Sequence, residues 1–129
     1  MRVASLGAGR MGRGVAVVFS YAGHDVAVVD FKERPKADFE KLAQETRGEI
    51  EGILHTLARI GLVQADDVAT LMKRVTVVPA SGAPEAFGAA DYIFEALPEL
   101  LDLKREALAR ASALAGKDTI IASTTSTIL

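Results

Sequence analysis

The stretch "SLGAGRMGRGVAVVFSYAG", residues 5–23, places five of the chain's eleven glycines in an otherwise apolar run. Gly7, Gly9 and Gly12 have the spacing G-x-G-x-x-G, which is informative only where a strand precedes it and a helix follows it. The apolar run at residues 3–6 predicts a buried strand. The apolar residues that follow at helical spacing are Met11, Val15, Val18, Phe19 and Ala22. The stretch therefore predicts a strand, a tight turn and a helix.

Each glycine of such a unit has a physical role when a dinucleotide binds there. Gly7 permits the turn, Gly9 lets the backbone approach a pyrophosphate, and Gly12 lets the helix pack closely on the strand. The phosphates would lie at the N-terminus of the helix, where unpaired N–H groups and the positive end of the dipole face them. Arg10 and Met11 stand between these glycines and are included as candidate cofactor-binding residues.

A carboxylate follows at the distance that a dinucleotide site needs. The segment "GHDVAVVD", residues 23–30, predicts a turn and a second strand that ends in Asp30. Asp30 lies 18 residues past Gly12, close to the ~20 expected for the carboxylate that binds the adenosine ribose. Because Asp30 would repel a 2′-phosphate, NAD is predicted over NADP. Lys32 and Arg34 could weaken that preference, although charges on a solvated loop are more often plain surface residues. A βαβ unit that binds no ligand is the alternative.

Composition predicts one soluble globular domain over residues 1–129. The formal net charge is −2 and no basic stripe stands out, so neither nucleic acid nor an anionic membrane is expected as a partner. The absence of cysteine excludes disulfides, thiol catalysis and cysteine metal sites, and no metal is expected. No apolar run approaches a membrane span, and the N-terminal segment lacks a signal-peptide core. We therefore expect a cytoplasmic protein.

The rest of the chain alternates between helices and strands. The pattern is helical from residue 35 to 72, with a natural stop at Gly61 and a second helix at about 65–72. The first of these helices has an apolar face made of Leu42, Thr46, Ile50, Ile53, Leu54, Leu57 and Ile60. The pair is longer than a crossover requires and is expected to project as an arm. Strands are predicted at 74–78, 91–96 and 118–124, with a helix at about 99–115 between the last two.

This alternation predicts the fold class. Buried-looking strands separated by helices indicate a parallel sheet covered on both faces. The expectation is a Rossmann-like, doubly wound α/β fold with a projecting helical arm. Its strand order should begin 3-2-1-4-5, which puts the ligand at the carboxyl ends of the first and fourth strands.

Three segments carry a resemblance to a known family. They are "GAGRMGRGVAVVFSYAGHDVAVVD" at 7–30, "ADYIFEALPELLDLKREAL" at 90–108 and "IIASTTS" at 120–126, with the helical arm between the first two. Together they resemble the N-terminal NAD-binding domain of the 3-hydroxyacyl-CoA dehydrogenases, in the same order and over the whole chain. Members of that family oxidise the 3-hydroxyl of an acyl-CoA to a ketone and pass the hydride to NAD. The resemblance thus implies NAD as cofactor, an acyl-CoA substrate and a place in fatty acid metabolism.

The resemblance also implies roles for single residues. Asp30 would hold the adenosine ribose, and Ser126 would reach the substrate oxygen. The residues implied to line the nicotinamide half of the groove are Ala96, Glu99 and Lys104. Thr124 stands where the family usually has asparagine, so a hydroxyl replaces an amide at a position associated with nicotinamide or substrate. Taken without the resemblance, Glu99 and Lys104 are equally typical of solvated charges, and Ser126 of a strand end without chemistry.

The sequence departs from the family in what it lacks. Family enzymes take the hydroxyl proton with a histidine, oriented by a carboxylate, from segments that follow the serine-containing strand. Neither His24 nor His55 matches that position, and both are expected to be structural or surface residues. The helical domain that binds substrate and usually forms the homodimer is also expected to lie outside this chain. We therefore expect the cofactor-binding domain of a larger dehydrogenase, inactive alone.

Two other functions stay open. One is the NAD domain of a related hydroxy-acid dehydrogenase, such as a sugar-acid enzyme resembling lambda-crystallin. The other is a non-catalytic NAD-binding module that senses redox state or serves assembly. Because function depends on the site and not on the fold, the sequence pattern alone does not separate them.

Overall fold

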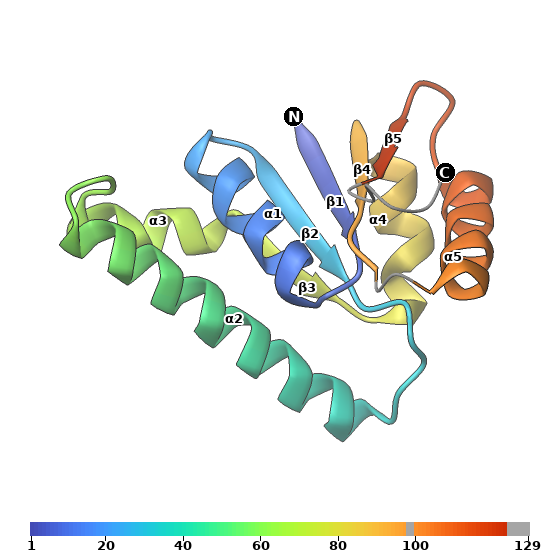
Figure 1. Cartoon of the computed structure of the whole chain (residues 1–129), viewed down its shortest axis with the longest axis horizontal. Helices are drawn as coiled ribbons and strands as arrows, with labels where there is room; N and C mark the ends of the chain where they lie inside the picture. Colours follow the sequence, from blue (N-terminus) through green and yellow to red (C-terminus); the bar gives the residue numbers. More distant parts are fainter. Residues whose placement is uncertain (98–99, 124–129) are drawn as a thin grey trace.

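The computed structural model describes residues 1–97 and 100–123, which form a five-stranded parallel sheet with helices on both faces (Figure 1). The strand order is β3-β2-β1-β4-β5. The elements are β1 (Arg2–Leu6), α1 (Arg10–Tyr21), β2 (Asp25–Val29), α2 (Lys36–Arg59), η1 (Ala65–Asp67), α3 (Val68–Lys73), β3 (Val75–Val78), η2 (Ala80–Gly82), α4 (Ala83–Ala89), β4 (Tyr92–Glu95), α5 (Leu101–Leu114) and β5 (Ile120–Ser123). Both the Rossmann-like fold and the predicted strand order are confirmed.

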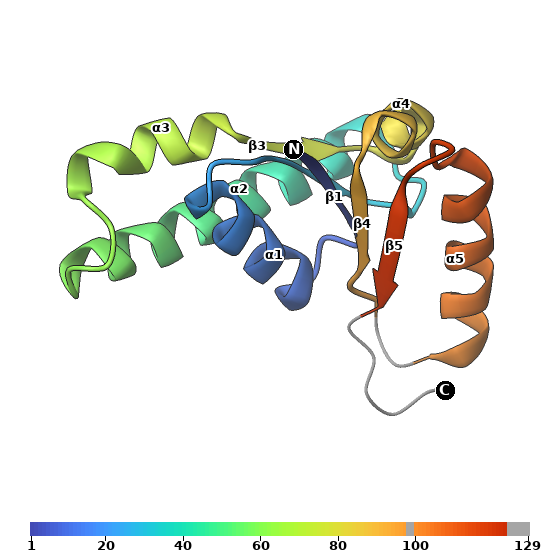
Figure 2. The same cartoon turned by 90° about the horizontal axis from the view of Figure 1, so that it is seen from above.

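Two apolar cores lie on opposite faces of the sheet. Val28 of β2 packs with Ile50 of α2 in a cluster that also includes α1 and α3. Ile93 of β4 packs with Phe87 of α4 in the second cluster, which α5 completes. Figure 2 shows this separation, with α1, α2 and α3 on one side of the strands and α4 and α5 on the other. Burial on both faces explains why the strands are nearly continuous apolar runs.

The buried face of α1 agrees only in part with the one that the apolar spacing predicted: Val15 and Phe19 pack against the core as expected. Met11 and Val18 are 54% and 60% exposed, whereas Gly12, Ala16 and Ser20 are buried. These three small residues are spaced four apart, so they line one face of the helix. Small side chains let α1 approach the sheet closely, and this requirement for closeness outweighs the preference for burying the larger apolar residues.

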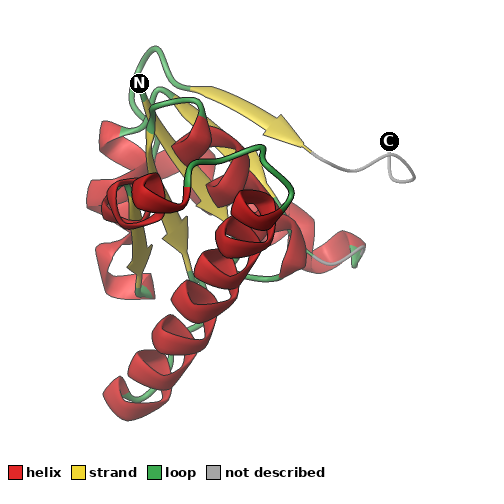
Figure 3. Cartoon of the chain, turned by 90° about the vertical axis from the view of Figure 1, so that its left-hand side faces the viewer, coloured by secondary structure: helices red, strands yellow, loops and turns green. Residues whose placement is uncertain are grey.

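The long helix α2 crosses one face of the sheet and extends beyond it together with α3, as the predicted helical arm (Figure 1, Figure 3). Thr46, Ile50 and Leu54 of its predicted apolar face are fully buried. Ile60, predicted on the same face, is 65% exposed because it lies past the last helical turn, beside Gly61. Gly61 has a φ of +84°, the left-handed conformation that commonly ends a helix.

The helix α4 was not predicted. Its segment contains glycine and proline, which are typical of loops, but Pro84 lies in the first helical turn, where no N–H is needed. Phe87 anchors the helix: it is fully buried and meets the Phe31 ring edge-on, with 5.4 Å between ring centroids. Tertiary packing, and not local propensity, therefore forms α4.

Candidate functional site

The glycine turn after β1 contacts two neighbouring strand ends. Gly7 has a φ of +119°, and its N–H donates to the Val29 carbonyl at the end of β2 at 3.0 Å. A Cβ atom at Gly7 would lie 2.8 Å from the Ala96 carbonyl oxygen, just past β4. Both the backbone conformation and the space therefore require glycine. The turn also places Ala96, one of the candidate residues, directly beside Gly7.

Gly12 and Ser5 hold this turn in place. A Cβ at Gly12 would overlap the Gly7 carbonyl oxygen and lie 2.8 Å from Ser5 Oγ. The Ser5 hydroxyl is fully buried and donates to the same Gly7 carbonyl at 2.9 Å. Ser5 was not among the candidates from the sequence, although a polar residue inside an apolar strand just before the glycines is a usable signal.

Gly9 faces open space at the N-terminus of α1. Nothing among the described residues lies within 4 Å of a Cβ built there, and no described side chain caps the helix at this position. Arg10 and Met11, the first helical residues, are exposed beside it. An uncapped helix N-terminus with a bare backbone in front of it suits a phosphate group. The turn thus has the shape that the sequence predicted.

Asp30 lies at the same edge of the sheet, immediately after the Val29 carbonyl that binds the glycine turn. Its own N–H donates to the Val78 carbonyl at the end of β3 at 2.9 Å. The side chain is only 8% exposed, and its Oδ2 accepts a hydrogen bond from Arg34 Nε at 2.7 Å. Oδ1 accepts a longer one, 3.3 Å, from the Lys32 backbone N–H. The carboxylate is thus fixed at the sheet edge and paired with a loop cation.

A hollow of about 300 Å³ is lined in part by Lys32 and Arg34, the two residues that donate to this carboxylate. It is lined by Lys32, Glu33, Arg34, Phe39, Pro79, Ala80 and Ser81. These residues come from the segments that follow β2 and β3, so the hollow lies at the carboxyl edge. Its volume is at the lower end of the range for small-molecule sites, roughly 300–1,000 Å³.

A second carboxylate, Glu95, lies at the end of β4. It is fully buried, and its Oε2 accepts the Leu97 backbone N–H at 2.7 Å. Its Oε1 accepts the Ser123 hydroxyl of β5 at 2.8 Å and lies 3.1 Å from Lys104 Nζ of α5. Lys104 is 4% exposed, so it is not the solvated charge that its spacing also allowed. The Glu95–Lys104 pair is buried, and together with Ser123 it joins β4, β5 and α5.

The contacts around Glu95 act on its ionisation in opposite directions. Burial raises the pKa of the carboxyl, but the Leu97 N–H, the Ser123 hydroxyl and the Lys104 ammonium together hold that pKa below its usual range. The charged form is therefore the stable one, and Glu95 forms an ion pair with Lys104. The sequence analysis gave Lys104 a role in the site and gave none to Glu95, although an acidic residue that closes a buried central strand at the ligand edge was an available signal.

The other candidates divide into two groups. Glu99, Thr124 and Ser126 lie outside the described residues, so their proposed roles stay predictions. The two histidines are described and lie away from the carboxyl edge. His24 precedes β2, with Nδ1 3.3 Å from the N-terminal amine, and His55 on α2 is half exposed, with Nε2 3.4 Å from Glu51. Within residues 1–97 and 100–123, no group of three or more histidine, aspartate or glutamate side chains could hold a metal ion.

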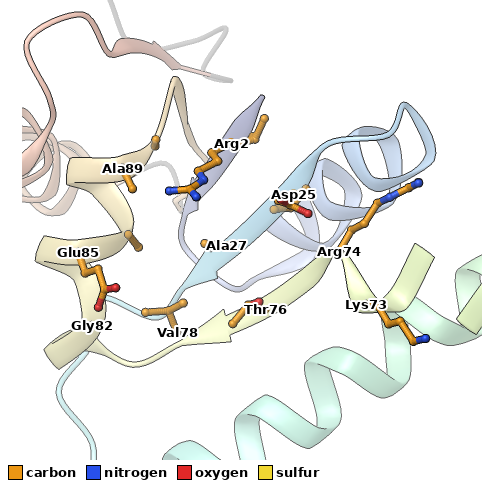
Figure 4. A pocket seen from close by; sticks show the side chains of 14 residues that line it. Arg2, Asp25, Ala27, Lys73, Arg74, Thr76, Val78, Gly82, Glu85 and Ala89 are labelled. Atoms are coloured by element: carbon orange, nitrogen blue, oxygen red, sulfur yellow. The ribbon is translucent and has the colours of Figure 1, made fainter. Parts of the chain in front are cut away.

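A larger hollow, about 510 Å³, lies elsewhere on the sheet (Figure 4). It runs along β2 and β3 beside α4, and Arg2, Asp25 and Arg74 mark its end at the amino edge of the strands. Ligands of doubly wound sheets bind at the opposite edge. This hollow is therefore distinct from the candidate site.

In an open sheet of this order, the ligand crevice forms where the strand order reverses, here between β1 and β4. The glycine turn meets Ala96 at that point, and Asp30 closes the adjacent strand. Fold and site together define the class of dinucleotide-binding α/β domains.

Comparison with known proteins makes this class specific. Residues 2–129 match the family described as "3-hydroxyacyl-CoA dehydrogenase, NAD binding domain", and the chain belongs to that family, whose cofactor is NAD. It is 37% identical over 125 residues to L-carnitine dehydrogenase of Streptomyces coelicolor, covering 97% of this chain and 35% of the relative. It is 31% identical over 129 residues to human mitochondrial hydroxyacyl-coenzyme A dehydrogenase, covering 98% and 39%.

The same similarity extends to three dimensions. The crystal structure of (S)-3-hydroxybutyryl-CoA dehydrogenase from Ralstonia eutropha superposes with a TM-score of 0.83 at 28% identity, over 98% of this chain and 41% of that one. The chain thus spans less than half the length of these relatives. Among the described residues, no helix is long and apolar enough to cross a membrane.

Proposed function

We propose that this chain is the NAD-binding part of an enzyme that oxidises a 3-hydroxyacyl-CoA to a 3-ketoacyl-CoA. The observation that carries the proposal is the open glycine turn at Gly9 beside the Asp30 strand end, in a chain that matches the dehydrogenase family from residue 2 to 129. The pyrophosphate would lie against Gly9 and the N-terminus of α1, near Arg10, and Asp30 would receive the ribose hydroxyls.

The nicotinamide half would lie towards β4. Ala96 adjoins the glycine turn, and Lys104 is held near the end of β4 by Glu95. NAD, when bound, supplies the hydride acceptor, while the protein contributes binding and orientation. Glu99, Thr124 and Ser126 complete the proposed site, with Ser126 reaching the substrate oxygen.

A base is needed to take the hydroxyl proton as the hydride leaves, and a base must lie within hydrogen-bond reach of that proton. His24 and His55 lie away from the carboxyl edge. We propose that a histidine and its orienting carboxylate come from a helical domain beyond these residues, which also binds substrate and forms a homodimer. Neither nucleic acid nor a membrane is proposed as a partner.

The second candidate is a dehydrogenase of a free hydroxy acid. It is favoured by the higher identity to L-carnitine dehydrogenase, 37% against 31% for the human hydroxyacyl-CoA enzyme. Carnitine carries the 3-hydroxyl on a small acid without coenzyme A, so the same NAD domain suits both reactions. A sugar acid is a further substrate of this kind.

The test measures NADH formation from 3-hydroxybutyryl-CoA and from L-carnitine. The chain is assayed alone and with the C-terminal domain of the human or the Streptomyces coelicolor relative supplied in trans. We expect no turnover by the chain alone, turnover with a supplied domain, and loss of that turnover in Ser126→Ala. Because the supplied domain binds substrate, only a preference for L-carnitine with both supplied domains would favour the second candidate. NADH binding without turnover under any condition would favour a non-catalytic module.

A cytoplasmic location stays a prediction from the sequence. The human relative is named as mitochondrial. When cells that express the protein are fractionated, we expect to detect it in the cytoplasmic fraction.

A further inference from the structure

The ribose-binding carboxylate is already paired in this structure. Asp30 Oδ2 accepts from Arg34 Nε at 2.7 Å, and Oδ1 accepts from the Lys32 N–H at 3.3 Å. A ribose diol that donates to Asp30 would use these same oxygens, each of which already accepts one hydrogen bond. Since a carboxylate oxygen has two acceptor sites, the diol would share the carboxylate with Arg34 or displace it, and in either case the Arg34 pair lowers the gain from binding the adenosine end.

Arg34 is the displaceable member of this pair. It lies in the loop between β2 and α2, four residues past Asp30, and its side chain is 32% exposed against 8% for the carboxylate. Partly exposed ion pairs contribute only about 0–1 kcal/mol, because water and salt replace them readily. Asp30, by contrast, is tied to the end of β3 by its N–H bond to the Val78 carbonyl at 2.9 Å. The guanidinium can leave while the carboxylate stays.

Once displaced from Asp30, the Arg34 guanidinium is available to bind an anionic group. Arg34 and Lys32 line the 300 Å³ hollow together with one acidic residue, Glu33, so a group attached to the ribose 2′-oxygen would meet two cationic side chains and one carboxylate. Arginine binds phosphate through paired, charge-assisted hydrogen bonds. Arg34 would therefore weaken the binding of a ribose diol and stabilise a bound 2′-phosphate.

We propose that Arg34 is a specificity-determining residue that narrows the preference of this site for NADH over NADPH. It masks Asp30 from the ribose diol, and it offers its guanidinium to a 2′-phosphate. The inference rests on the proposed cofactor site at Asp30.

The experiment uses ligands that report on the adenosine end alone. Calorimetry measures binding of AMP and of adenosine 2′,5′-bisphosphate to the wild-type chain and to Arg34→Gln, with NADH and NADPH as the full cofactors. Arg59→Gln is the matched control, because Arg59 ends α2 and donates to Thr56 away from the hollow.

Arg34→Gln is expected to bind AMP and NADH about two- to five-fold more tightly, the gain from removing a partly exposed ion pair. It should bind the bisphosphate and NADPH about ten-fold or more weakly, the loss of hydrogen bonds to a charged group. Arg59→Gln should keep the wild-type ratio of AMP to bisphosphate affinity.

Three results would overturn the inference. If the wild-type chain binds none of the four nucleotides, both the proposed cofactor site and the inference are wrong. If the wild-type chain binds AMP and NADH but Arg34→Gln keeps the wild-type ratio of AMP to bisphosphate affinity, the inference alone is wrong. Weaker AMP binding by Arg34→Gln would mean that Arg34 contacts the adenosine and does not mask Asp30. Circular dichroism confirms that both variants are folded.

Discussion

Two strands of this sheet end in a carboxylate, Asp30 after β2 and Glu95 at the end of β4, and the two are held differently. Asp30 pairs with one side chain, that of a partly exposed arginine four residues on. Glu95 is fully buried and accepts bonds from its own loop, from β5 and from α5. We propose that the partner of the first exchanges for a ligand, whereas the partners of the second join three elements of the fold. The position of a carboxylate at the ligand edge therefore does not by itself define its role.

The largest effect should come from removing the charge of Glu95. Glu95→Gln should lower the free energy of unfolding by roughly 3–5 kcal/mol, because it removes the negative charge that lies 3.1 Å from the buried Lys104 ammonium. Urea unfolding measures the loss. Ser123→Ala, which removes one hydrogen bond to the same carboxylate, should cost only about 1 kcal/mol. Equal effects of the two variants would show that the ion pair adds nothing.

At Asp30 the effect should fall on binding and not on folding. Asp30→Ala should weaken NADH by about 1.5–3 kcal/mol, the range for a hydrogen bond to a charged group, and spare NADPH. Its unfolding free energy should change by less than about 1 kcal/mol, as expected for a partly exposed ion pair. Calorimetric titration with both cofactors is the measurement. A uniform loss for NADH and NADPH would instead assign Asp30 to the fold.

Lowering the pH should remove the contribution of Glu95 to the free energy of unfolding. Because the folded state holds the pKa of Glu95 below its usual range, its stabilisation is complete above the unfolded-state pKa, about 4.3. That stabilisation is lost as pH falls through the folded-state pKa. The difference in unfolding free energy between wild type and Glu95→Gln should therefore narrow below about pH 4.3. A difference that stays constant down to pH 3 would contradict this assignment.

The comparison also separates what sequence could predict from what it could not. The glycine turn and Asp30 follow from short, fixed spacings along one βαβ unit, and the structure gives Gly7, Gly9 and Gly12 the predicted surroundings. The Glu95 cluster joins residues up to 28 positions apart. No local spacing encodes such a contact, so the sequence did not predict the partners of Glu95.

The fold class and strand order were predicted correctly, and the two details that were not, α4 and part of the buried face of α1, depend on tertiary packing in the same way. Strand order could be predicted because buried strands alternate with helices. The helix α4 was not predicted because its segment is rich in glycine and proline. Phe87 forms that helix by packing under the sheet, a contact that local propensity does not report. On α1, apolarity favoured Met11 and Val18, but close approach to the sheet selected the small residues Gly12 and Ala16.

The central claim is that the pyrophosphate of NAD lies against the backbone at Gly9, and titration of Gly9→Val with NADH tests it most directly. A Cβ at Gly9 or at Gly14 meets nothing within 4 Å in the described part of the chain, so Gly14→Val in the same helix is the matched control. Both variants should melt near the wild-type temperature. Gly14→Val should bind NADH normally, and Gly9→Val should not bind it detectably, because the added side chain fills the space that the pyrophosphate needs. Wild-type NADH affinity in Gly9→Val would contradict the account.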